Sequence, residues 1–244
     1  MKVLVLGGTA EARDIAESLA DEPGFEIMTS LAGRVREPRL PVGGVRVGGF
    51  GGAEGLREWL AANAVDALVV ATHPFAARIS ANAAHAAVAA GVPMVAVRRP
   101  PWTPQPRDTW HPVASLSEAA QTIPALGQRV FLTVGRQGVA DFAALDSTWF
   151  LIRAIDPPTG AVPPQHELLL ARGPFTTEYE TELFWSRRIE VLVTKNSGGE
   201  QTSAKLEVAR NLGLPVVIVD RPALPAGVAT VESAAAAVDW LHSQ

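Results

Sequence analysis

Residues 3–13 read VLVLGGTAEAR, a sequence typical of a buried strand, a glycine turn and the first turn of a helix. Four consecutive apolar residues before the glycines suit a strand that is covered on both faces of a sheet. The helix that follows has apolar residues at helical spacing, namely Ala12, Ile15, Ala16 and Leu19. Thr9 stands at its N-cap, so free backbone N–H groups and the positive end of the helix dipole face outward from the strand end. Such a turn is suited to binding phosphate.

The turn differs from the dinucleotide fingerprint Gly-x-Gly-x-x-Gly/Ala at the middle glycine, where this chain has Thr9. A glycine there lets the backbone approach a pyrophosphate closely, so Thr9 predicts a different phosphate pose or a hydroxyl that supplies a hydrogen bond. We expect a cofactor to contact the turn residues Gly7, Gly8, Thr9, Ala10 and Glu11. The alternative is a strand-to-helix turn without a ligand.

Composition excludes several classes of protein. The 244 residues are 48% hydrophobic, enough for one large domain or two ordinary ones. A net charge of -4 with scattered Lys and Arg argues against nucleic acid as a partner. The absence of cysteine excludes disulfides, thiolate nucleophiles and cysteine-bound metals, and the widely spaced histidines predict no metal site. With no signal peptide or membrane span in the sequence, we expect a cytoplasmic protein.

The first hundred residues alternate between strand and helix patterns. Strand patterns cover 25–30, 45–47, 67–71 and 92–97, and helix patterns cover 53–63 and 77–90. This alternation predicts a doubly wound parallel sheet, and right-handed crossovers place the loops after Leu6, Ser30 and Ala71 at one edge. We therefore expect residues 1–99 to form a Rossmann-like cofactor domain.

The loop after the second strand pattern indicates which dinucleotide binds. An NAD site has a carboxylate about 20 residues beyond the glycines, whereas an NADP site has a basic residue for the 2′-phosphate. No carboxylate ends this strand, and the loop instead supplies Ser30, Ala32, Gly33 and Arg34, with Arg36 close behind. The sequence therefore favours NADPH. The alternative is that both arginines are only solvated loop charges.

A third loop at the same edge carries Thr72, His73, Pro74 and Phe75. We include these four residues in the predicted cofactor site, because they follow a buried parallel strand directly. His73 is placed to hydrogen-bond the nicotinamide, the ribose or the substrate. The alternative is a loop histidine with none of these roles.

Residues 100–111 are rich in proline and predict a stiff linker between two domains. Arg98 and Arg99 come just before it, and Trp102 lies near its start. We expect the arginines to contact an anionic ligand lying between the lobes. The alternative is a surface brace anchored by Trp102.

Residues 112–244 continue the strand and helix alternation and predict a second α/β domain. Its segment 189–199 resembles the opening unit, because the polar turn TKNSGG at 194–199 follows an apolar strand and precedes a helix expected from residue 200 to 212. The segment is not a P-loop, since its lysine precedes the glycines. Candidate anion ligands in this domain are Arg136, Lys195, Ser197, Gly198 and Lys205. The alternative is an ordinary turn with an exposed lysine. The predicted fold is thus α/β, with two Rossmann-like lobes, helices flanking each parallel sheet, and a cleft between the lobes.

Four motifs in this order resemble the precorrin-6A reductase family of cobalamin biosynthesis (CobK/CbiJ) over essentially the full chain. They are LGGTAEA at 6–12, ATHPFA at 71–76, RPPW at 99–102 and TKNSGG at 194–199. The resemblance implies NADPH-dependent reduction of one carbon–carbon double bond of precorrin-6A, giving precorrin-6B. It also implies a tetrapyrrole substrate rich in carboxylates, which suits the cationic candidates above together with Arg98 and Arg99.

The residues alone single out no catalytic acid or base. His73, Lys195 and Tyr179 are the candidate proton donors, and solvent is the alternative. Three other functions stay open: reduction of the cobalt-containing substrate, a non-catalytic NADPH sensor, and a two-lobed transferase for an activated sugar. The sequence does not define the oligomeric state, and a monomer is compatible with it.

Overall fold

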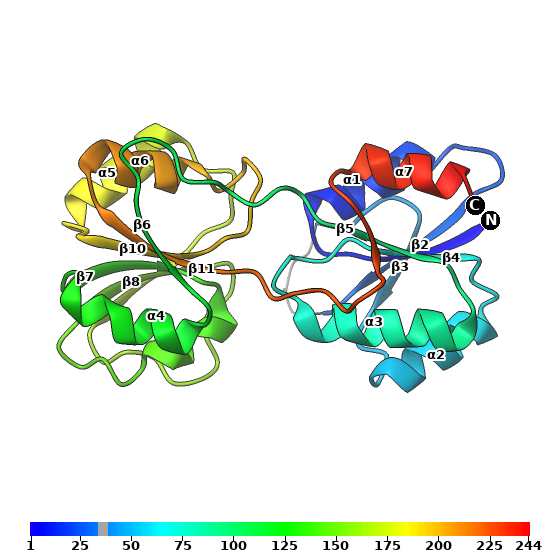
Figure 1. Cartoon of the computed structure of the whole chain (residues 1–244), viewed down its shortest axis with the longest axis horizontal. Coiled ribbons are helices and arrows are strands. Elements are labelled where there is room, and N and C mark those ends of the chain that lie inside the picture. Colours follow the sequence, from blue (N-terminus) through cyan, green and yellow to red (C-terminus); the bar gives the residue numbers. More distant parts are fainter. Residues whose placement is uncertain (34–38) are drawn as a thin grey trace. The chain divides into compact units, whose positions relative to one another are not determined.

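The structure is a computed structural model that describes residues 1–33 and 39–244. The chain folds as two units: Met1–Pro100 with Pro222–Gln244 form unit 1, and Pro101–Arg221 form unit 2. In its described residues each unit has a six-stranded sheet with helices on both faces (Figure 1). All strand pairs of both sheets are parallel. The predicted α/β class with two Rossmann-like lobes is confirmed.

Unit 1 is built around the opening strand. Its elements are β1 (Lys2–Leu6), α1 (Ala10–Leu19), β2 (Glu26–Leu31), β3 (Gly44–Val47), α2 (Ala53–Ala62), β4 (Ala67–Val70), α3 (Ala77–Ala90), β5 (Met94–Val97), β12 (Ala229–Val231) and α7 (Ala234–His242). The strand order is β12-β5-β4-β1-β2-β3. Alternate residues of β1 enter two cores: Val3 and Val5 pack with α1 and α7, whereas Leu4 and Leu6 pack with α2 and α3. The loops after β1, β2 and β4 therefore share one edge, as predicted.

The C-terminal segment returns to unit 1 instead of completing the second domain. Strand β12 pairs with β5, with Ala229 opposite Val95 and Val231 opposite Val97. Ala237 and Leu241 of α7 are fully buried in the same core as Val3. The predicted domain boundary of 112–244 is therefore wrong for residues 222–244. Periodicity predicted this strand and helix, but it does not say which sheet they join.

Unit 2 has the same kind of sheet. Its elements are β6 (Thr109–Val113), α4 (Leu116–Thr122), the 3-10 helix η1 (Ile123–Ala125), β7 (Arg129–Thr133), the 3-10 helix η2 (Arg136–Phe142), β8 (Trp149–Ala154), β9 (His166–Leu170), α5 (Thr177–Ser186), β10 (Val191–Lys195), α6 (Ala204–Leu212) and β11 (Pro215–Val219). Helices α5 and α6 cover one face, and α4 covers the other (Figure 1). Because β6 begins at Thr109, the linker predicted at 100–111 is shorter than expected.

The two sheets have the same topology, but equivalent strands come at different points in the sequential order of strands. The order β6-β11-β10-β7-β8-β9 matches the order of unit 1 when β7 takes the place of β1 and β10 takes the place of β4. The expectation that segment 189–199 repeats the opening unit is therefore wrong in its details, since the counterpart of β1 is β7. Both β1 and β10 are buried parallel strands, and buried parallel strands all have similar apolar runs.

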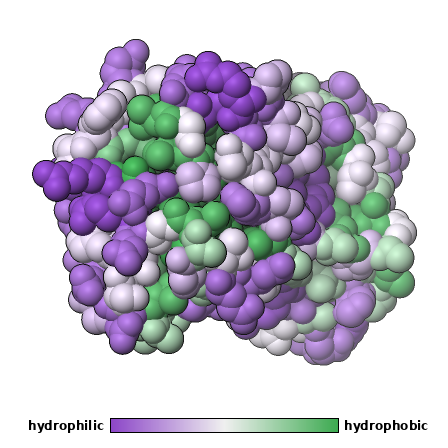
Figure 2. Space-filling view, turned by 60° about the vertical axis from the view of Figure 1, so that its left-hand side comes forward, coloured by the Kyte–Doolittle hydropathy of each residue, from purple (hydrophilic) through white to green (hydrophobic). Residues whose placement is uncertain are grey.

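Among the described residues, no helix is both long and apolar enough to cross a bilayer. On the face drawn in Figure 2, hydrophobic residues form separate patches among hydrophilic ones. The large apolar side chains that are most exposed are scattered over different elements, and they include Val88, Trp185 and Leu40.

Candidate functional site

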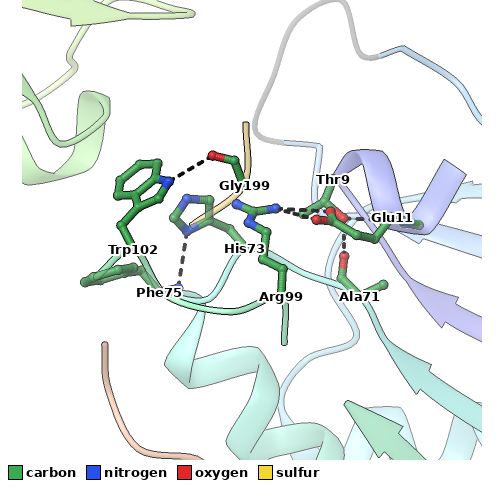
Figure 3. A network of polar contacts seen from close by, with 9 residues as sticks. Thr9, Glu11, Ala71, His73, Phe75, Arg99, Trp102 and Gly199 are labelled. Carbon is green, nitrogen blue, oxygen red and sulfur yellow. Dashed lines mark hydrogen bonds and ion pairs between the residues drawn. The ribbon is translucent and has the colours of Figure 1, made fainter. Parts of the chain in front are cut away.

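Thr9 ties two loops together at the carboxyl edge of the unit 1 sheet. As predicted, it caps α1: its Oγ1 accepts a hydrogen bond from the Ala12 backbone N–H at 3.3 Å. The same hydroxyl donates to the Ala71 carbonyl oxygen at 2.7 Å, directly after β4 (Figure 3). The single proton of the Thr9 hydroxyl is thus used in a hydrogen bond within the protein. This bond joins the turn after β1 to the turn after β4.

The two glycines of this turn serve different purposes. A Cβ at Gly7 would lie 2.8 Å from the Thr29 Cγ2 atom, so close packing against β2 excludes a side chain there. Gly8 has a φ of +115, is exposed, and has no atom of the described residues within 4 Å of where a Cβ would lie. The backbone at Gly8 is therefore open to a ligand, and its conformation favours glycine.

Glu11 and Arg99 form an ion pair beside this turn, within unit 1. The Arg99 Nη1 atom lies 2.8 Å and 3.1 Å from the two Glu11 carboxylate oxygens (Figure 3). Burial disfavours the charged carboxylate of Glu11. The hydrogen bond and positive charge of Arg99, with a hydrogen bond from the Glu11 backbone, outweigh this effect and hold the pKa of Glu11 below its ordinary value. Arg99, which we expect to contact an anionic ligand, thus also lies beside the predicted cofactor turn.

The end of β2 presents a buried hydroxyl and an arginine that sequence reasoning missed. Ser30 is 5% exposed and lies opposite Arg46 of β3 in the sheet register. The Arg46 Nη1 atom lies 3.5 Å from the Ser30 Oγ atom. Ala32 and Gly33, which follow β2, are exposed, whereas the predicted ligands Arg34 and Arg36 lie outside the described residues. The alternation Val45-Arg46-Val47 beside the second strand was the signal that could have identified Arg46.

The loop after β4 contains an orphan hydroxyl next to His73. Among the described residues, the buried Thr72 Oγ1 atom has no hydrogen-bond partner. The Nδ1 atom of His73 accepts a hydrogen bond from the Phe75 backbone N–H at 3.2 Å (Figure 3). With Nδ1 as acceptor, the proton of a neutral His73 ring is on Nε2. An unsatisfied buried hydroxyl at this edge is what a ligand with polar groups would complete.

In unit 2 the polar loop after β10 is held by Trp102. The indole Nε1 of Trp102 donates to the Gly199 carbonyl oxygen at 2.9 Å (Figure 3). The Trp102 backbone N–H donates to the Asn196 Oδ1 atom, also at 2.9 Å. Gly198 and Gly199 have φ values of 65 and 79, in the left-handed region that favours glycine. Helix α6 begins only at Ala204, so the prediction that these glycine amides lie at a helix start is wrong.

Lys195 and Arg136 lie at the same edge of the unit 2 sheet. Lys195 ends β10, and Arg136 begins η2 just after the neighbouring strand β7. Burial lowers the pKa of Lys195 from its ordinary value, and the negative charge of Asp141 opposes this shift. Tyr179, the third candidate proton donor, lies in the first turn of α5, where it stacks on Phe175. The topology thus brings two predicted anion ligands, Lys195 and Arg136, to one sheet edge.

Two predicted substrate ligands have other partners. Lys205 is 3% exposed; its Nζ donates to the Thr202 carbonyl oxygen at 3.0 Å and lies 5.2 Å from the centre of the Trp102 ring. Arg98 donates from both Nη atoms to the Pro222 carbonyl oxygen, at 3.3 Å and 3.2 Å. Because the amphipathic pattern of α6 places Lys205 on its buried face, the ammonium of this predicted anion ligand lies inside unit 2. Arg98 braces the returning chain within unit 1.

Comparison with known proteins gives consistent matches over the full chain. A family model described as precorrin-6x reductase CbiJ/CobK matches residues 2–242. The precorrin-6A reductases of Rhodococcus erythropolis and Mycobacterium tuberculosis are 59% and 51% identical, over 98% of this chain and 97% of each relative. A cobalt-precorrin-6A reductase of Salmonella typhimurium is 27% identical over 96% of this chain and 93% of its own length. A solved structure described as CobK precorrin-6A reductase is 44% identical and matches with a TM-score of 0.93, covering 100% of this chain and 96% of that one.

Proposed function

This chain belongs to the precorrin-6x reductase CbiJ/CobK family and is a reductase of cobalamin biosynthesis, and from this premise we propose that NADPH is its hydride donor. The observation that carries the proposal is the open backbone at Gly8, at the start of α1 and at the carboxyl edge of a parallel sheet. Dinucleotide phosphates bind at such turns, where backbone N–H groups and the helix dipole favour negative charge.

The residues of unit 1 fit this cofactor. Gly7 keeps the turn close to β2, and Gly8 leaves room above the backbone for phosphate oxygens. Ala10 and Glu11 would supply backbone N–H groups of the first helical turn, while Arg99 neutralises the Glu11 carboxylate that would otherwise repel a phosphate. Thr9 would act indirectly, because its hydroxyl holds the turn against Ala71.

The remaining cofactor contacts are assigned by position at the sheet edge. Ser30, Ala32, Gly33 and Arg34 would contact the adenosine half of the cofactor. The loop with Thr72, His73, Pro74 and Phe75 would contact the nicotinamide half, where the orphan Thr72 hydroxyl gains a partner. When bound, NADPH supplies the hydride that reduces one carbon–carbon double bond, and the protein supplies orientation.

The tetrapyrrole would bind through charge-assisted hydrogen bonds in unit 2. Lys195 and Arg136 supply cations at one sheet edge, and the loop with Ser197 and Gly198 supplies smaller polar contacts. The substrate carries acetate and propionate carboxylates, which match these groups in charge. We assign no substrate contact to Lys205, because its ammonium is buried.

Reduction also requires a proton on the carbon next to the one that receives the hydride. The candidate donors are His73, with its proton on Nε2, and Lys195, whose partly buried ammonium has a lowered pKa. A donor role predicts that His73→Asn or Lys195→Met lowers kcat and shifts its pH profile. If kcat keeps its wild-type pH profile in both variants, the proton comes from solvent or from another group.

Anaerobic incubation with precorrin-6A tests the activity directly. We expect NADPH oxidation at equimolar stoichiometry with a change in the tetrapyrrole spectrum, and slower turnover with NADH. NADPH binding without its oxidation would favour the sensor function and contradict the reductase. The relatives that are 46–59% identical over most of the chain reduce precorrin-6A by name, and those at 26–30% reduce cobalt-precorrin-6A, so we propose the cobalt-free substrate. A parallel incubation with the cobalt-containing substrate tests that choice.

A further inference from the structure

Arg46 lies against the end of β2. In folds of this type, the adenosine half of a dinucleotide binds at this strand end. Arg46 lies in β3, directly opposite Ser30 of β2 in the parallel register. The third strand therefore brings a cation to the position where the sequence shows no carboxylate. This placement depends on strand pairing and is independent of the loop that follows Gly33.

The Arg46 guanidinium is fixed from two sides. Its Nη1 and Nη2 atoms donate to the carbonyl oxygens of Gly48 and Gly49, each at 2.7 Å. Its Cζ atom lies 3.9 Å from the centre of the Phe50 ring, a cation–π distance. The side chain is therefore oriented before any ligand binds, and little rotamer entropy remains to be lost on binding.

A purely structural role leaves part of this arrangement unexplained. Among residues 1–33 and 39–244, no carboxylate forms an ion pair with Arg46, although the side chain is half-buried. Three hydrogen bonds from Nη1 and Nη2 leave two of the five guanidinium N–H groups of Arg46 without a partner among those residues. A fixed arginine with spare donors and no counter-ion is suited to a phosphate.

We propose that Arg46, with Ser30 beside it, reads the 2′-phosphate of NADPH and so determines the preference for NADPH over NADH. The guanidinium donates to phosphate oxygens and balances their charge, and the Ser30 hydroxyl supports the same group. This inference rests on the proposed use of NADPH. It adds a specificity-determining residue to that function.

Binding of nucleotide halves by the full chain separates the two proposals. Calorimetry would compare adenosine 2′,5′-bisphosphate with adenosine 5′-phosphate for the wild type, Arg46→Gln and Arg46→Lys. Arg57→Gln serves as a matched control, because Arg57 lies on α2 and pairs with Glu54. We expect the wild type and the control to bind the bisphosphate with a lower Kd than adenosine 5′-phosphate. In Arg46→Gln the ratio of the two Kd values should fall by about 10- to 100-fold, and in Arg46→Lys it should fall less.

Each other outcome overturns one or both proposals. If Arg46→Gln keeps the wild-type preference for the bisphosphate, Arg46 does not read the 2′-phosphate, while NADPH stays the cofactor. If Arg46→Gln weakens both nucleotides equally, the arginine is only a brace for the turn after β3, and the specificity role is wrong. If the wild type has no preference for the bisphosphate, the proposed use of NADPH fails and the role of Arg46 fails with it.

Discussion

The side-chain amide of Asn196 is paired with both backbone polar groups of Trp102. The Trp102 N–H donates to Asn196 Oδ1 at 2.9 Å, and Asn196 Nδ2 donates to the Trp102 carbonyl oxygen at 3.2 Å. The Asn196 carbonyl oxygen accepts from Arg221 Nε at 2.6 Å. Residues at both ends of unit 2 therefore converge on the loop that we propose to bind the substrate.

Replacing Asn196 should weaken substrate binding more than cofactor binding. Asn196→Ala removes both hydrogen bonds to Trp102, each worth about 1 kcal/mol, and loosens the loop that carries Ser197 and Gly198. We expect KM for the tetrapyrrole to rise about tenfold and KM for NADPH to stay within twofold. Steady-state kinetics with each substrate varied in turn measure this split.

A matched variant separates this effect from a general loss of stability. Asn211 is exposed on α6 of the same unit, so Asn211→Ala changes the same side chain away from the loop. It should have wild-type constants for both substrates. Equal increases of both KM values in Asn196→Ala would show that the amide supports the whole fold and not the substrate loop.

The two glycines of the β1–α1 turn should fail in different ways when each becomes alanine. Gly7→Ala places a Cβ 2.8 Å from Thr29 Cγ2, and overpacking of this kind costs about 1–3 kcal/mol of folding free energy. Gly8→Ala meets open space, but its positive φ costs about 1–3 kcal/mol, and the added methyl group lies where we propose that phosphate binds. Gly7→Ala should mainly lower Tm, and Gly8→Ala should also raise Kd for NADPH about tenfold or more. Calorimetric unfolding and NADPH titration of both variants test the contrast, which an equal effect on Kd would contradict.

The local features of the β1–α1 turn were predictable, because they depend on neighbours in sequence. Thr9 was recognised as the N-cap, and residues 3–6 as a strand covered on both faces, from short-range chemistry alone. The second partner of Thr9, the Ala71 carbonyl oxygen, comes from another strand. No local pattern reports such a contact, so the direction of the hydroxyl proton was not predictable.

Partners that depend on the sheet order could not be predicted from local sequence patterns. The pairing of Arg99 with Glu11 is one of them, because it requires that β5 and β1 belong to the same sheet. Arg46 was overlooked because its importance follows from the pairing of β3 with β2. The same limit explains residues 222–244, whose apolar pattern fits either sheet and whose pairing with β5 was decided by tertiary packing.

The ion pair of Glu11 and Arg99 should matter more for cofactor binding than for folding. Arg99→Gln leaves a half-buried carboxylate beside the proposed phosphate position, and we expect Kd for NADPH to rise about tenfold. Glu11→Gln removes the charge that Arg99 neutralises, so the double variant should recover much of the lost affinity. Additive effects in this double-mutant cycle, measured by NADPH titration, would contradict a coupled pair.

The buried ammonium of Lys205 should make stability depend on pH in a defined direction. Burial lowers the pKa of Lys205 from 10.5 to about 7. The positive charge of Arg153 lowers this pKa further, and the negative charge of Glu180 opposes the shift. Between these two values the unfolded chain binds a proton that the folded chain does not, so this residue's contribution to stability rises with pH. The contribution is nearly constant well below pH 7, and between pH 7 and 10.5 its slope approaches about 1.4 kcal/mol per pH unit.

Lys205→Met removes the titrating group and leaves an unbranched side chain that is one atom shorter. The variant should unfold at a higher temperature than the wild type at pH 6.5, and this difference should shrink steadily as the pH rises to 9.5. Lys2→Met is the matched control, because Lys2 is partly exposed and forms a surface ion pair with Glu26. Its difference from the wild type should stay nearly constant over the same range. A constant difference for Lys205→Met would mean that the ammonium keeps its proton in the fold, stabilised by the Glu180 carboxylate.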